Sequence, residues 1–522
     1  MPVVAGQVVS GVEAARAWSA ALARNVRRRA LEVAVRACGS VRRAARGSVP
    51  TAETGGIEYR LRRSLADRLV LAVKLLLAGV VVERRGRLIG DVDSINQRPA
   101  GAGRKRGRMT RPKDKSFAIP KLLVWEAWRQ VKANKGAPGV DGQDLDAFEK
   151  DLEGNLYKVW NRMSSGTWFA APVRAVEIPK PHGGGVRMLG VPTIADRVAQ
   201  TTVAKFLEPL VEPRFHQDSY GYRPERSPHD ALAVTRERCW KYDWAIDLDV
   251  QKFFDEVPWD LIVRAVEAVT DCRWVLLYVK RWLHAPLQHP DGTLEQRSRG
   301  TPQGSAISPC LANLFMHYAF DSWMAREIPG CPFERFADDV IVHCKSRAQA
   351  EAVLARIAER MNEVGLRLHP DKTRIVYCKD GKRRGEHEHT SFTFLGFTFR
   401  ARQARATGGG YFTSFLPAMS TEALKAKSTE LRRMRIHRRT DLTLNDLARW
   451  LNPIIVGWMN YYGRYYWTVM DALLQRVNTY LRRWAGKKYR RLRTFKRFKR
   501  WWTGLHEREP GLFAHWRWVR AY

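Results

Sequence analysis

The stretch that decides the fold lies at residues 333–344 and reads FERFADDVIVHC. Apolar residues flank an adjacent pair of acids, Asp338 and Asp339, and this pattern predicts a strand, a tight turn and a second strand. Aspartate is common in turns, so the pair alone is weak support for chemistry. A second cluster strengthens the interpretation, because residues 244–255, WAIDLDVQKFFD, form another alternating apolar strand with acids where it ends.

Carboxylates that two strands deliver to one point suit a pair of hard divalent cations. Mg²⁺ prefers oxygen ligands and keeps open positions for substrate phosphates. Two such ions about 4 Å apart can stabilise both the attacking and the leaving oxygen of a phosphoryl transfer. We therefore expect Asp249, Asp338 and Asp339 to be the metal ligands of a nucleotidyl transferase that uses two Mg²⁺ ions, with Mn²⁺ as a substitute.

The charge of the chain indicates a polyanionic partner. Its 522 residues carry a formal net charge of +37, and such an excess is typical of nucleic-acid-binding proteins. Residues 1–108 hold 22 Lys and Arg against 8 Asp and Glu, and residues 421–522 hold 24 against 7. Net charges of +14 and +17 at the two ends leave +6 for residues 109–420, where the acidic clusters lie. This distribution favours an enzyme that acts on nucleic acid and grips it separately.

Cysteine spacing and hydropathy favour a soluble, cytosolic protein without a membrane partner. The seven cysteines are scattered and form no Cys-x-x-Cys pair, which is typical of reduced thiols. No cleavable signal is apparent. The apolar stretch at residues 69–82 is too short to cross a bilayer.

Residues 1–108 differ in texture from the rest of the chain. They contain two of its 55 aromatic residues, Trp18 and Tyr59, whereas packed domains usually carry more large aromatic anchors. We expect a basic extension that is either disordered nucleic-acid-binding sequence or the product of a mis-assigned start, with translation beginning at Met109. Mass spectrometry of the natively expressed N-terminus separates these hypotheses.

From residue 109 the pattern is that of an α+β enzyme built around a small, mostly antiparallel sheet. Apolar spacing predicts helices at 120–133, 145–156, 194–207 and 347–364. Alternation predicts a hairpin of 175–178 with 187–190, and strands at 374–378 and 392–399.

After residue 420 the chain becomes helical and basic. Apolar residues between 447 and 465 recur at helical spacing, and Asn452-Pro453 predicts the cap and first residue of a new helix within that span. Basic clusters alternate with aromatics over residues 482–500, which suits phosphate contacts and stacking on unpaired bases, although a solvated helix whose aromatics face the core stays open. The basic residues that we expect to contact nucleic acid are Arg482, Arg483, Lys487, Lys488, Arg490, Arg491, Lys496 and Arg497.

Taken together, these residues resemble the bacterial type of the group II intron-encoded reverse transcriptase/maturase family over roughly residues 109–522, which implies a cytoplasmic location in a bacterium. The resemblance is carried by an ordered set of motifs, each of them weak alone. They are GAPGVDG at 136–142, IPK at 178–180, RMLGVP at 187–192, YGYRP at 220–224, DVQKFFD at 249–255, GTPQGS at 300–305, SP at 308–309, FADD at 336–339 and FLGF at 394–397.

The resemblance implies a right-hand polymerase fold with fingers and palm at 109–420, a helical thumb or maturase region at 421–485, and a basic DNA-binding tail at 486–522. It implies metal coordination by the three acids and by the carbonyl of Val250. It also implies that Lys372 is the acid that protonates departing pyrophosphate, although simple solvation of this lysine stays open.

The remaining positions that the resemblance assigns touch the nucleotide and the primer. Phe254 would exclude a 2′-hydroxyl, although a plain core phenylalanine beside Phe253 stays open. The other nucleotide-binding positions are Lys180, Arg187, Gln303 and Gly304. The segment that supports the primer end would be Phe394, Leu395 and Gly396.

Two departures from the family pattern stand out. Phe336 occupies a position where tyrosine is commoner, so a hydroxyl is missing beside the acids. No Cys-rich H-N-H-type nuclease is visible after Arg500, so we expect no DNA cleavage by this chain and no mobility without a nick or 3′ end from elsewhere.

The sequence therefore predicts an RNA-directed DNA polymerase that also binds a structured group II intron RNA and assists its splicing and mobility. Its partners would be that RNA, an RNA template, a DNA primer or target, and dNTPs; monomer and dimer stay open. The alternatives are a defence- or adaptation-associated reverse transcriptase, and a splicing-only maturase with an inactive polymerase. A simple basic RNA chaperone does not explain the acidic clusters.

Overall fold

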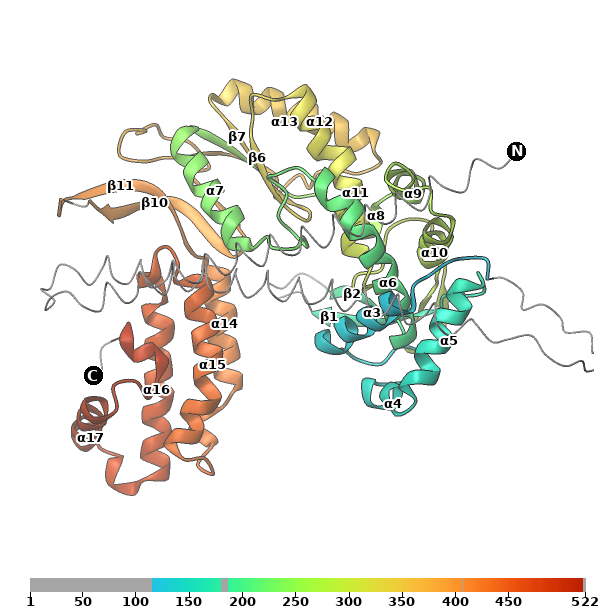
Figure 1. Ribbon diagram of the computed structural model, residues 1–522. Helices are drawn as coiled ribbons and strands as arrows, with labels where there is room; N and C mark the ends of the chain where they lie inside the picture. Colours follow the sequence, from blue (N-terminus) through green and yellow to red (C-terminus); the bar gives the residue numbers. More distant parts are fainter. Residues whose placement is uncertain (1–114, 180–185, 407, 520–522) are drawn as a thin grey trace, which may run out of the picture. The chain divides into compact units, whose positions relative to one another are not determined.

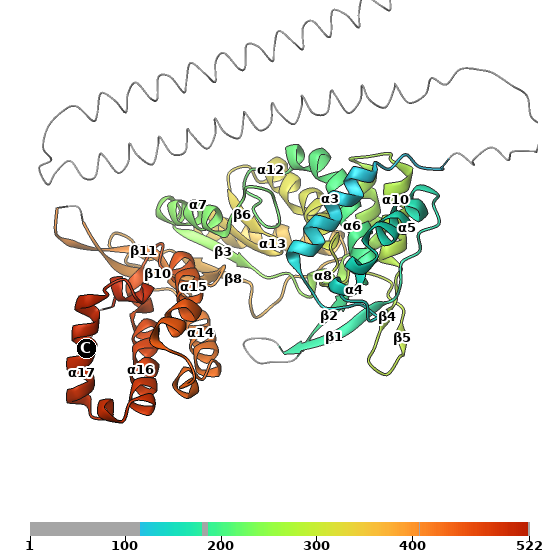
Figure 2. The ribbon, with the colours of Figure 1, turned by 60° about the horizontal axis from the view of Figure 1, so that its bottom comes forward.

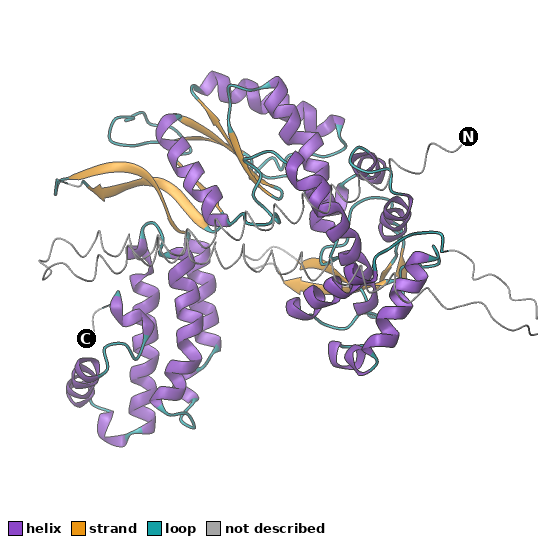
Figure 3. Cartoon of the chain, viewed as in Figure 1, coloured by secondary structure: helices purple, strands orange, loops and turns teal. Residues whose placement is uncertain are grey.

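The computed structural model of the protein describes residues 115–179, 186–406 and 408–519. Helices and strands are interleaved along these ranges (Figure 3). The helices are α3 Lys121–Asn134, α4 Leu145–Lys150, α5 Leu152–Ser164, α6 Ile194–Val211, α7 Pro228–Lys241, α8 Phe253–Glu256, α9 Trp259–Glu267, α10 Arg273–Leu283, α11 Ser308–Met316, α12 Ser322–Glu327, α13 Arg347–Glu363, α14 Thr421–Arg433, α15 Leu444–Tyr462, α16 Asp471–Lys488 and α17 Phe495–Arg508. The strands are β1 Val173–Pro179, β2 Val186–Val191, β3 Trp244–Leu248, β4 Leu287–Gln288, β5 Leu294–Glu295, β6 Phe333–Phe336, β7 Asp339–Cys344, β8 Arg374–Tyr377, β9 Ser391–Phe394, β10 Phe397–Arg405 and β11 Tyr411–Met419.

The central sheet has the strand order β6-β7-β3-β8, and every pairing in it is antiparallel. The predicted strand–turn–strand at residues 333–344 is confirmed, since Phe336 pairs with Asp339 across the turn. Helix α13 packs on β3, β7 and β8, and α7 packs on β6 and β7 (Figure 1). Their buried residues fall into two separate clusters, because alternate residues of β3 such as Ala245 and Ile246 point to opposite faces.

Two further sheets accompany the central one. One has the order β2-β1-β4-β5 and contains the predicted hairpin of β1 with β2, with a short parallel pairing of β1 to β4 (Figure 2). The other has the order β11-β10-β9 and is antiparallel. The expected mixture of helices with mostly antiparallel strands is therefore confirmed, although the strands form three sheets and not one.

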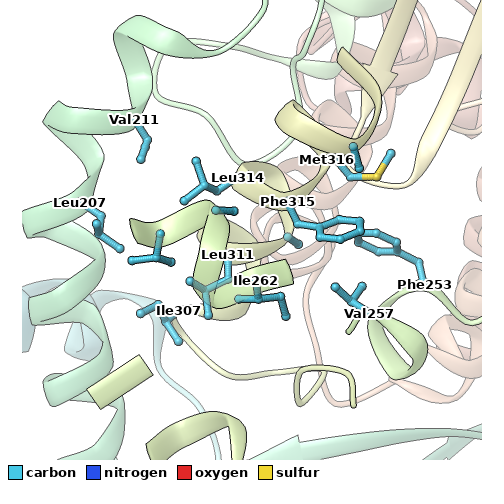
Figure 4. Close-up of a cluster of buried hydrophobic side chains, with 14 of the residues drawn as sticks. Leu207, Val211, Phe253, Val257, Ile262, Ile307, Leu311, Leu314, Phe315 and Met316 are labelled. Carbon is cyan, nitrogen blue, oxygen red and sulfur yellow. The ribbon is translucent and has the colours of Figure 1, made fainter. Parts of the chain in front are cut away.

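Side chains from well-separated helices form the main core (Figure 4). Leu207 and Val211 of α6 lie in this cluster with Leu311 and Phe315 of α11. The same cluster contains Phe253, one residue before the position expected to contact the sugar. Large buried side chains contribute roughly 1.5–3 kcal/mol each relative to exposure, so this packing holds the backbone near the acids firmly in place.

Most predicted helices are confirmed, but the one expected over residues 145–156 is interrupted. It is broken at Asp151 into α4 and α5. Asp151 leaves the helical conformation, with φ −125° and ψ 56°, and its carboxylate accepts a hydrogen bond from the Gly154 N–H. Aspartate favours this capping role because its short side chain satisfies a free N–H of the following helix.

The prediction of one strand over residues 392–399 is wrong, because the chain reverses in its middle. Leu395 and Gly396 both adopt positive φ, 52° and 78°, and form the turn of the β9–β10 hairpin. Phe394 pairs with Phe397 across this turn. Alternating aromatics on both strands produce one continuous pattern, so periodicity alone does not reveal the turn.

The predicted helix start at Asn452-Pro453 is also wrong, since α15 runs through both residues. The Asn452 side chain instead donates to the Leu512 carbonyl at 2.9 Å and accepts from the Ala514 N–H at 2.9 Å. A tertiary contact thus uses the polar group that resembled a cap.

A buried arginine ties the acidic turn to the rest of the fold. Arg335 is 0% exposed and pairs with Asp321, also 0% exposed, through two N–H···O bonds of 2.7 and 2.6 Å. Asp321 closes a π-helical segment, His317–Asp321. The remaining guanidinium N–H groups donate to the Asn313 side chain, to the Ser219 hydroxyl, and at 2.9 Å to the carbonyl of Ala337 in the turn. All five guanidinium donors are therefore satisfied in the interior.

We predict that Arg335→Ala lowers the free energy of unfolding by about 3–5 kcal/mol, because it leaves the Asp321 carboxylate buried without its partner. Urea denaturation of the two proteins measures this difference. Arg347→Ala is the matched control, since the Arg347–Glu351 pair is exposed and is expected to contribute about 0.5 kcal/mol or less. Equal losses in the two variants would contradict the role given to Arg335.

Candidate active site

Strand register brings the predicted acids together at one end of the central sheet. Leu248, the last residue of β3, pairs with Val340 of β7, so Asp249 lies next to the start of β7. Asp339 is the first residue of β7, and Asp338 precedes it in the turn. The convergence of two strand ends that the sequence suggested is therefore present in the structure.

The turn carrying Asp338 depends on a close backbone contact. Ala337 has φ 60°, in the left-handed region that non-glycine residues rarely adopt. Gly221 lies against it, and a Cβ at Gly221 would stand 2.5 Å from the Ala337 nitrogen. The YGYRP motif therefore needs glycine at this position so that its loop can press against the acidic turn.

Asp249 and Lys372 form an ion pair at the edge of the site. The distance from Lys372 Nζ to Asp249 Oδ2 is 2.8 Å, and both side chains are partly open to solvent. The loop after α13 holds the pair in place, because the His369 N–H donates to the Asp249 carbonyl and the Gln251 N–H donates to the Arg367 carbonyl. Val250 lies between these two hydrogen bonds and faces Leu368.

The acids repel one another in this neighbourhood. The pKa of Asp339 is raised to about 7. The largest cause is desolvation of its carboxylate, and repulsion from Asp338 and Asp249 comes next. Burial and the charge of Asp249 also raise the pKa of Asp338. Lys372 and Arg187 act in the opposite direction on the pKa of Asp339, so both cations lie within electrostatic reach of the site.

This charge pattern fits a hard divalent cation. Carboxylates that destabilise each other's charged forms gain from a cation placed between them, and oxygen-only donors match Mg²⁺. Within the described ranges, no three His, Cys, Asp or Glu side chains already stand in metal-binding geometry. The donor chemistry fits the ion, while the ligand roles of Asp249, Val250, Asp338 and Asp339 stay predictions.

The residues expected to contact the nucleotide lie on elements around the acids. Arg187 is on β2, opposite Ile178 of β1, and its charge affects the pKa of both Asp338 and Asp339. Lys180 lies outside the described residues. The side chain of Gln303 donates through Nε2 to the Asp255 carboxylate at 3.3 Å, and the backbone carbonyl of Gln303 accepts from the Gly190 N–H. Gly304 has φ 111° and packs against the Gly190 carbonyl, which leaves no room for a Cβ.

Phe254 is half-buried and lies edge-on to Phe253, with ring centroids 5.2 Å apart. Its neighbour Phe253 fills the core, whereas Phe254 only packs against its edge. The backbone of Phe254 is fixed, because its carbonyl accepts from the Thr301 N–H at 2.7 Å. The GTPQGS motif therefore holds Phe254 in place from behind.

The segment expected to support the primer is the turn of the β9–β10 hairpin. Phe394 is buried beneath it, whereas Leu395 and Gly396 are partly exposed. The Tyr461 hydroxyl of α15 donates to the Leu395 carbonyl at 3.0 Å, and the Ser420 N–H donates to the Gly396 carbonyl. This turn is thus positioned from the helical region that follows it.

The basic residues over 482–497 have different surroundings. Of the predicted nucleic-acid contacts, Arg482, Lys496 and Arg497 are among those whose side chains are exposed. The Lys488 ammonium donates to the carbonyls of Thr440 and Leu442, so it stabilises a neighbouring loop. Two aromatic residues of this stretch, Trp484 and Phe498, are fully buried. The expectation that aromatics here stack on bases is therefore wrong for these two.

Two further residues at the site were not singled out from the sequence. Asp247 lies on β3, two residues before Asp249. Burial, followed by the charges of Asp339 and Asp249, raises the pKa of Asp247 to about 7. The period-2 alternation of a strand could have revealed it. Tyr222 is 59% exposed, has φ 56°, and lies 6.5 Å from the Phe336 ring. Partial desolvation of the Tyr222 hydroxyl, followed by the charge of Asp338, raises the pKa of Tyr222, so this residue places a hydroxyl near the acids where Phe336 has none.

Comparison with known protein families gives two matches. The family described as "Reverse transcriptase (RNA-dependent DNA polymerase)" matches residues 178–399. The family described as "Group II intron, maturase-specific domain" matches residues 424–502. The first range contains the central sheet with the acids, and the second contains most of α14–α17.

Individual relatives agree with these matches. The protein YkfC of Escherichia coli K12 is 30% identical over 341 residues, which cover 56% of this chain and 86% of YkfC. The group II intron-encoded protein LtrA of Lactococcus lactis is 29% identical over 198 residues, covering 37% of this chain and 32% of LtrA. The putative COX1/OXI3 intron 1 protein of Saccharomyces cerevisiae is 30% identical over 204 residues, covering 39% and 24%. The chain thus spans less than a third of either intron-related relative.

Fold, acidic site and family matches define the class as a reverse-transcriptase domain followed by an intron maturase domain. Within that class, the chain belongs to the group II intron-encoded reverse transcriptase/maturase family. Among the helices of the described part of the chain, none is both long and apolar enough to span a membrane.

We predict that Asp247→Asn raises the melting temperature of the metal-free protein at pH 8 and that the gain shrinks towards pH 5. The folded-state pKa of about 7 lies above the ordinary value of 3.8, so the native state binds this proton more tightly. The resulting stabilisation is complete below about pH 4 and is lost as the pH rises through about 7. Melting curves in EDTA at several pH values measure the effect.

Asp291→Asn is the control with the opposite sign. Its pKa is lowered, chiefly by the hydrogen bond from the Thr293 N–H, so removing this charge should lower the melting temperature at pH 8. A pH-independent effect of Asp247→Asn would contradict the electrostatic account.

Proposed function

We propose that the protein is an RNA-directed DNA polymerase that also binds a structured group II intron RNA and assists its splicing and mobility. The observation that carries this proposal is the convergence of Asp249 with Asp338 and Asp339 within the region matched as a reverse transcriptase. The maturase match over residues 424–502 supports the intron RNA as partner and does not favour a defence-associated enzyme.

In the proposed reaction a primer 3′-oxygen attacks the α-phosphate of a dNTP, forming a P–O bond while the bond to pyrophosphate breaks. Asp249, Asp338, Asp339 and the Val250 carbonyl would hold two Mg²⁺ ions, or Mn²⁺ in their place. When bound, such ions stabilise the attacking and leaving oxygens. Arg187 on β2 would draw the triphosphate towards the acids, with Lys180 on the same hairpin.

Lys372 is the proposed proton donor to the departing pyrophosphate. Its ion pair with Asp249 keeps the ammonium at the edge of the site, within reach of a leaving group held by the acids. The contact with Asp249 is the observation that distinguishes Lys372 from an unpaired surface lysine and supports this role.

The proposed domain organisation follows the same division. Residues 109–420 would form fingers and palm, 421–485 the thumb or maturase region, and 486–522 a basic DNA-binding tail, with 1–108 as a basic extension. The primer end would rest on the Leu395–Gly396 turn, which Tyr461 of α15 contacts. Template, primer and dNTPs would therefore meet where the two matched regions adjoin.

We predict that purified protein extends a DNA primer on an RNA template with dNTPs and Mg²⁺, and that Asp338→Ala with Asp339→Ala abolishes extension. EDTA should stop the reaction and Mn²⁺ should restore part of it. Glu351→Ala on the exposed face of α13 is the control and should keep full activity. No extension by folded, RNA-binding wild-type protein would indicate a splicing-only maturase.

We predict that Phe254→Ala raises incorporation of ribonucleotides relative to deoxyribonucleotides by about tenfold or more, because it removes the ring that would collide with a 2′-hydroxyl. Single-nucleotide extension with dGTP or GTP measures the ratio of kcat/KM values. The control is Phe253→Leu, which alters the buried neighbour and should change stability more than selectivity. An unchanged ratio for Phe254→Ala would show that Phe254 is a core residue only.

A further inference from the structure

Beyond the end of β9, the β10–β11 hairpin continues as a two-stranded ribbon. β9 pairs with β10 only as far as Arg400, whereas β10 and β11 pair as far as Arg405 opposite Tyr411. Figure 1 shows this ribbon extending past α7. Isolated two-stranded ribbons are only marginally stable. The outer half of this ribbon therefore contributes little to the stability of the fold.

The ribbon is positively charged and has no acidic residue of its own. Residues 391–420 contain Arg400, Arg402 and Arg405 and no Asp or Glu. Arg402 donates to the carbonyls of Leu416 and Thr398, neither of which carries a formal charge. Burial, followed by the neighbouring charge of Arg400, lowers its pKa to about 10. An anion at this position would relieve the repulsion between the two guanidinium groups.

Large aromatic rings at the outer end are exposed to solvent. Tyr411 is 75% exposed and Phe412 is 51% exposed. Register places Tyr411 beside Arg405 on one face of the ribbon, while Phe412 shares the other face with Arg402. Gly409 and Gly410 lie at the tip, where an added Cβ would meet no atom within 4 Å. One face therefore offers an exposed ring directly opposite Arg405, and the other offers an exposed ring on the face that carries Arg402 and Arg400 towards the base.

The base of the ribbon lies next to the region matched as a maturase. The guanidinium carbon of Arg402 lies 5.4 Å from the centroid of the Tyr466 ring. Strand β11 leads through Ser420 directly into α14. A ligand held on the ribbon would therefore be close to the residues expected to bind intron RNA.

We propose that the outer half of this ribbon, together with Arg400 at its base, binds an unpaired segment of RNA, with bases stacked on Tyr411 and Phe412 and phosphates contacted by Arg400 and Arg405. Unpaired bases expose the π-faces that such rings need, whereas bases within a duplex do not. This proposal rests on the proposed function only for the identity of the RNA as intron RNA.

The test uses the full-length chain and two ribbon variants. One combines Tyr411→Ala with Phe412→Ala, and the other combines Arg400→Gln with Arg405→Gln. The probes are an unstructured RNA 20-mer, DNA of the same sequence, and a blunt RNA duplex, each measured at several salt concentrations. Melting temperatures confirm folding, and extension of a preformed template–primer duplex reports on the polymerase separately.

The aromatic variant should weaken binding of the RNA 20-mer by about 5- to 150-fold, as expected when base stacking is removed. The arginine variant should reduce the salt dependence by about 0.7 in log–log slope for each phosphate that is no longer neutralised. Duplex binding and primer extension should stay unchanged. Phe169→Ala, which removes a 72% exposed ring elsewhere, and Arg326→Gln with Arg347→Gln are the matched controls.

Wild-type affinity in both ribbon variants, or equal losses in the controls, would overturn the proposal. Equal losses for RNA and duplex would also overturn it, because they would indicate a general charge effect. A loss for DNA alone would assign the ribbon to DNA and contradict the stated ligand. A protein without polymerase activity that still shows the ribbon-dependent loss would disprove the proposed polymerase and leave the RNA site standing.

Discussion

The acidic site depends on one buried guanidinium. Arg335 lies on β6, immediately before the turn that carries Asp338, and its hydrogen bonds reach Asp321, Asn313, Ser219 and the Ala337 carbonyl. Asn313 donates in turn to the Gly221 carbonyl. One charge therefore joins the acidic turn, the YGYRP loop and the helices behind them. A buried charge tolerates few alternative arrangements, because each missing partner costs free energy in an interior of low dielectric. The left-handed conformation of Ala337 persists for this reason, since its surroundings leave it no other position.

The acids themselves are arranged against electrostatic preference. Asp249, Asp338 and Asp339 crowd together with Asp247, and the raised pKa values of Asp247 and Asp339 reflect the cost. The apolar packing of the central sheet between α7 and α13 offsets the free-energy cost of this repulsion. Cation binding is favoured at a site of this kind, because a divalent ion would remove the repulsion between the carboxylates. Lys372 provides part of this compensation for Asp249 in the metal-free protein.

The maturase region contacts the β9–β10 turn, which is expected to support the primer. Tyr461 donates to Leu395, and Ser420, the cap of α14, donates to Gly396. Tyr465 and Tyr461 also contact His229 at the start of α7. The aromatic residues of α15 thus have two roles. Trp458 fills the helical core, and Tyr461 holds the turn expected to support the primer. The same junction carries the base of the ribbon, so RNA held there would be close to both regions.

The sequence by itself determined the strand–turn–strand around Asp338, the cluster at Asp249, the charge distribution and the family, because these depend on local alternation and on ordered motifs. It could also have indicated Asp247, whose spacing from Asp249 is a property of any strand. Only the tertiary structure decided which polar groups serve which role. Asn452 resembles a helix cap but binds the Leu512–Ala514 segment, Trp484 and Phe498 resemble stacking residues but fill the core, and Tyr222 emerges beside the acids because its loop is pressed against the turn. The physical reason is that hydrogen bonding and burial are settled by partners far away in the chain, whereas periodicity and turn chemistry are settled by neighbours.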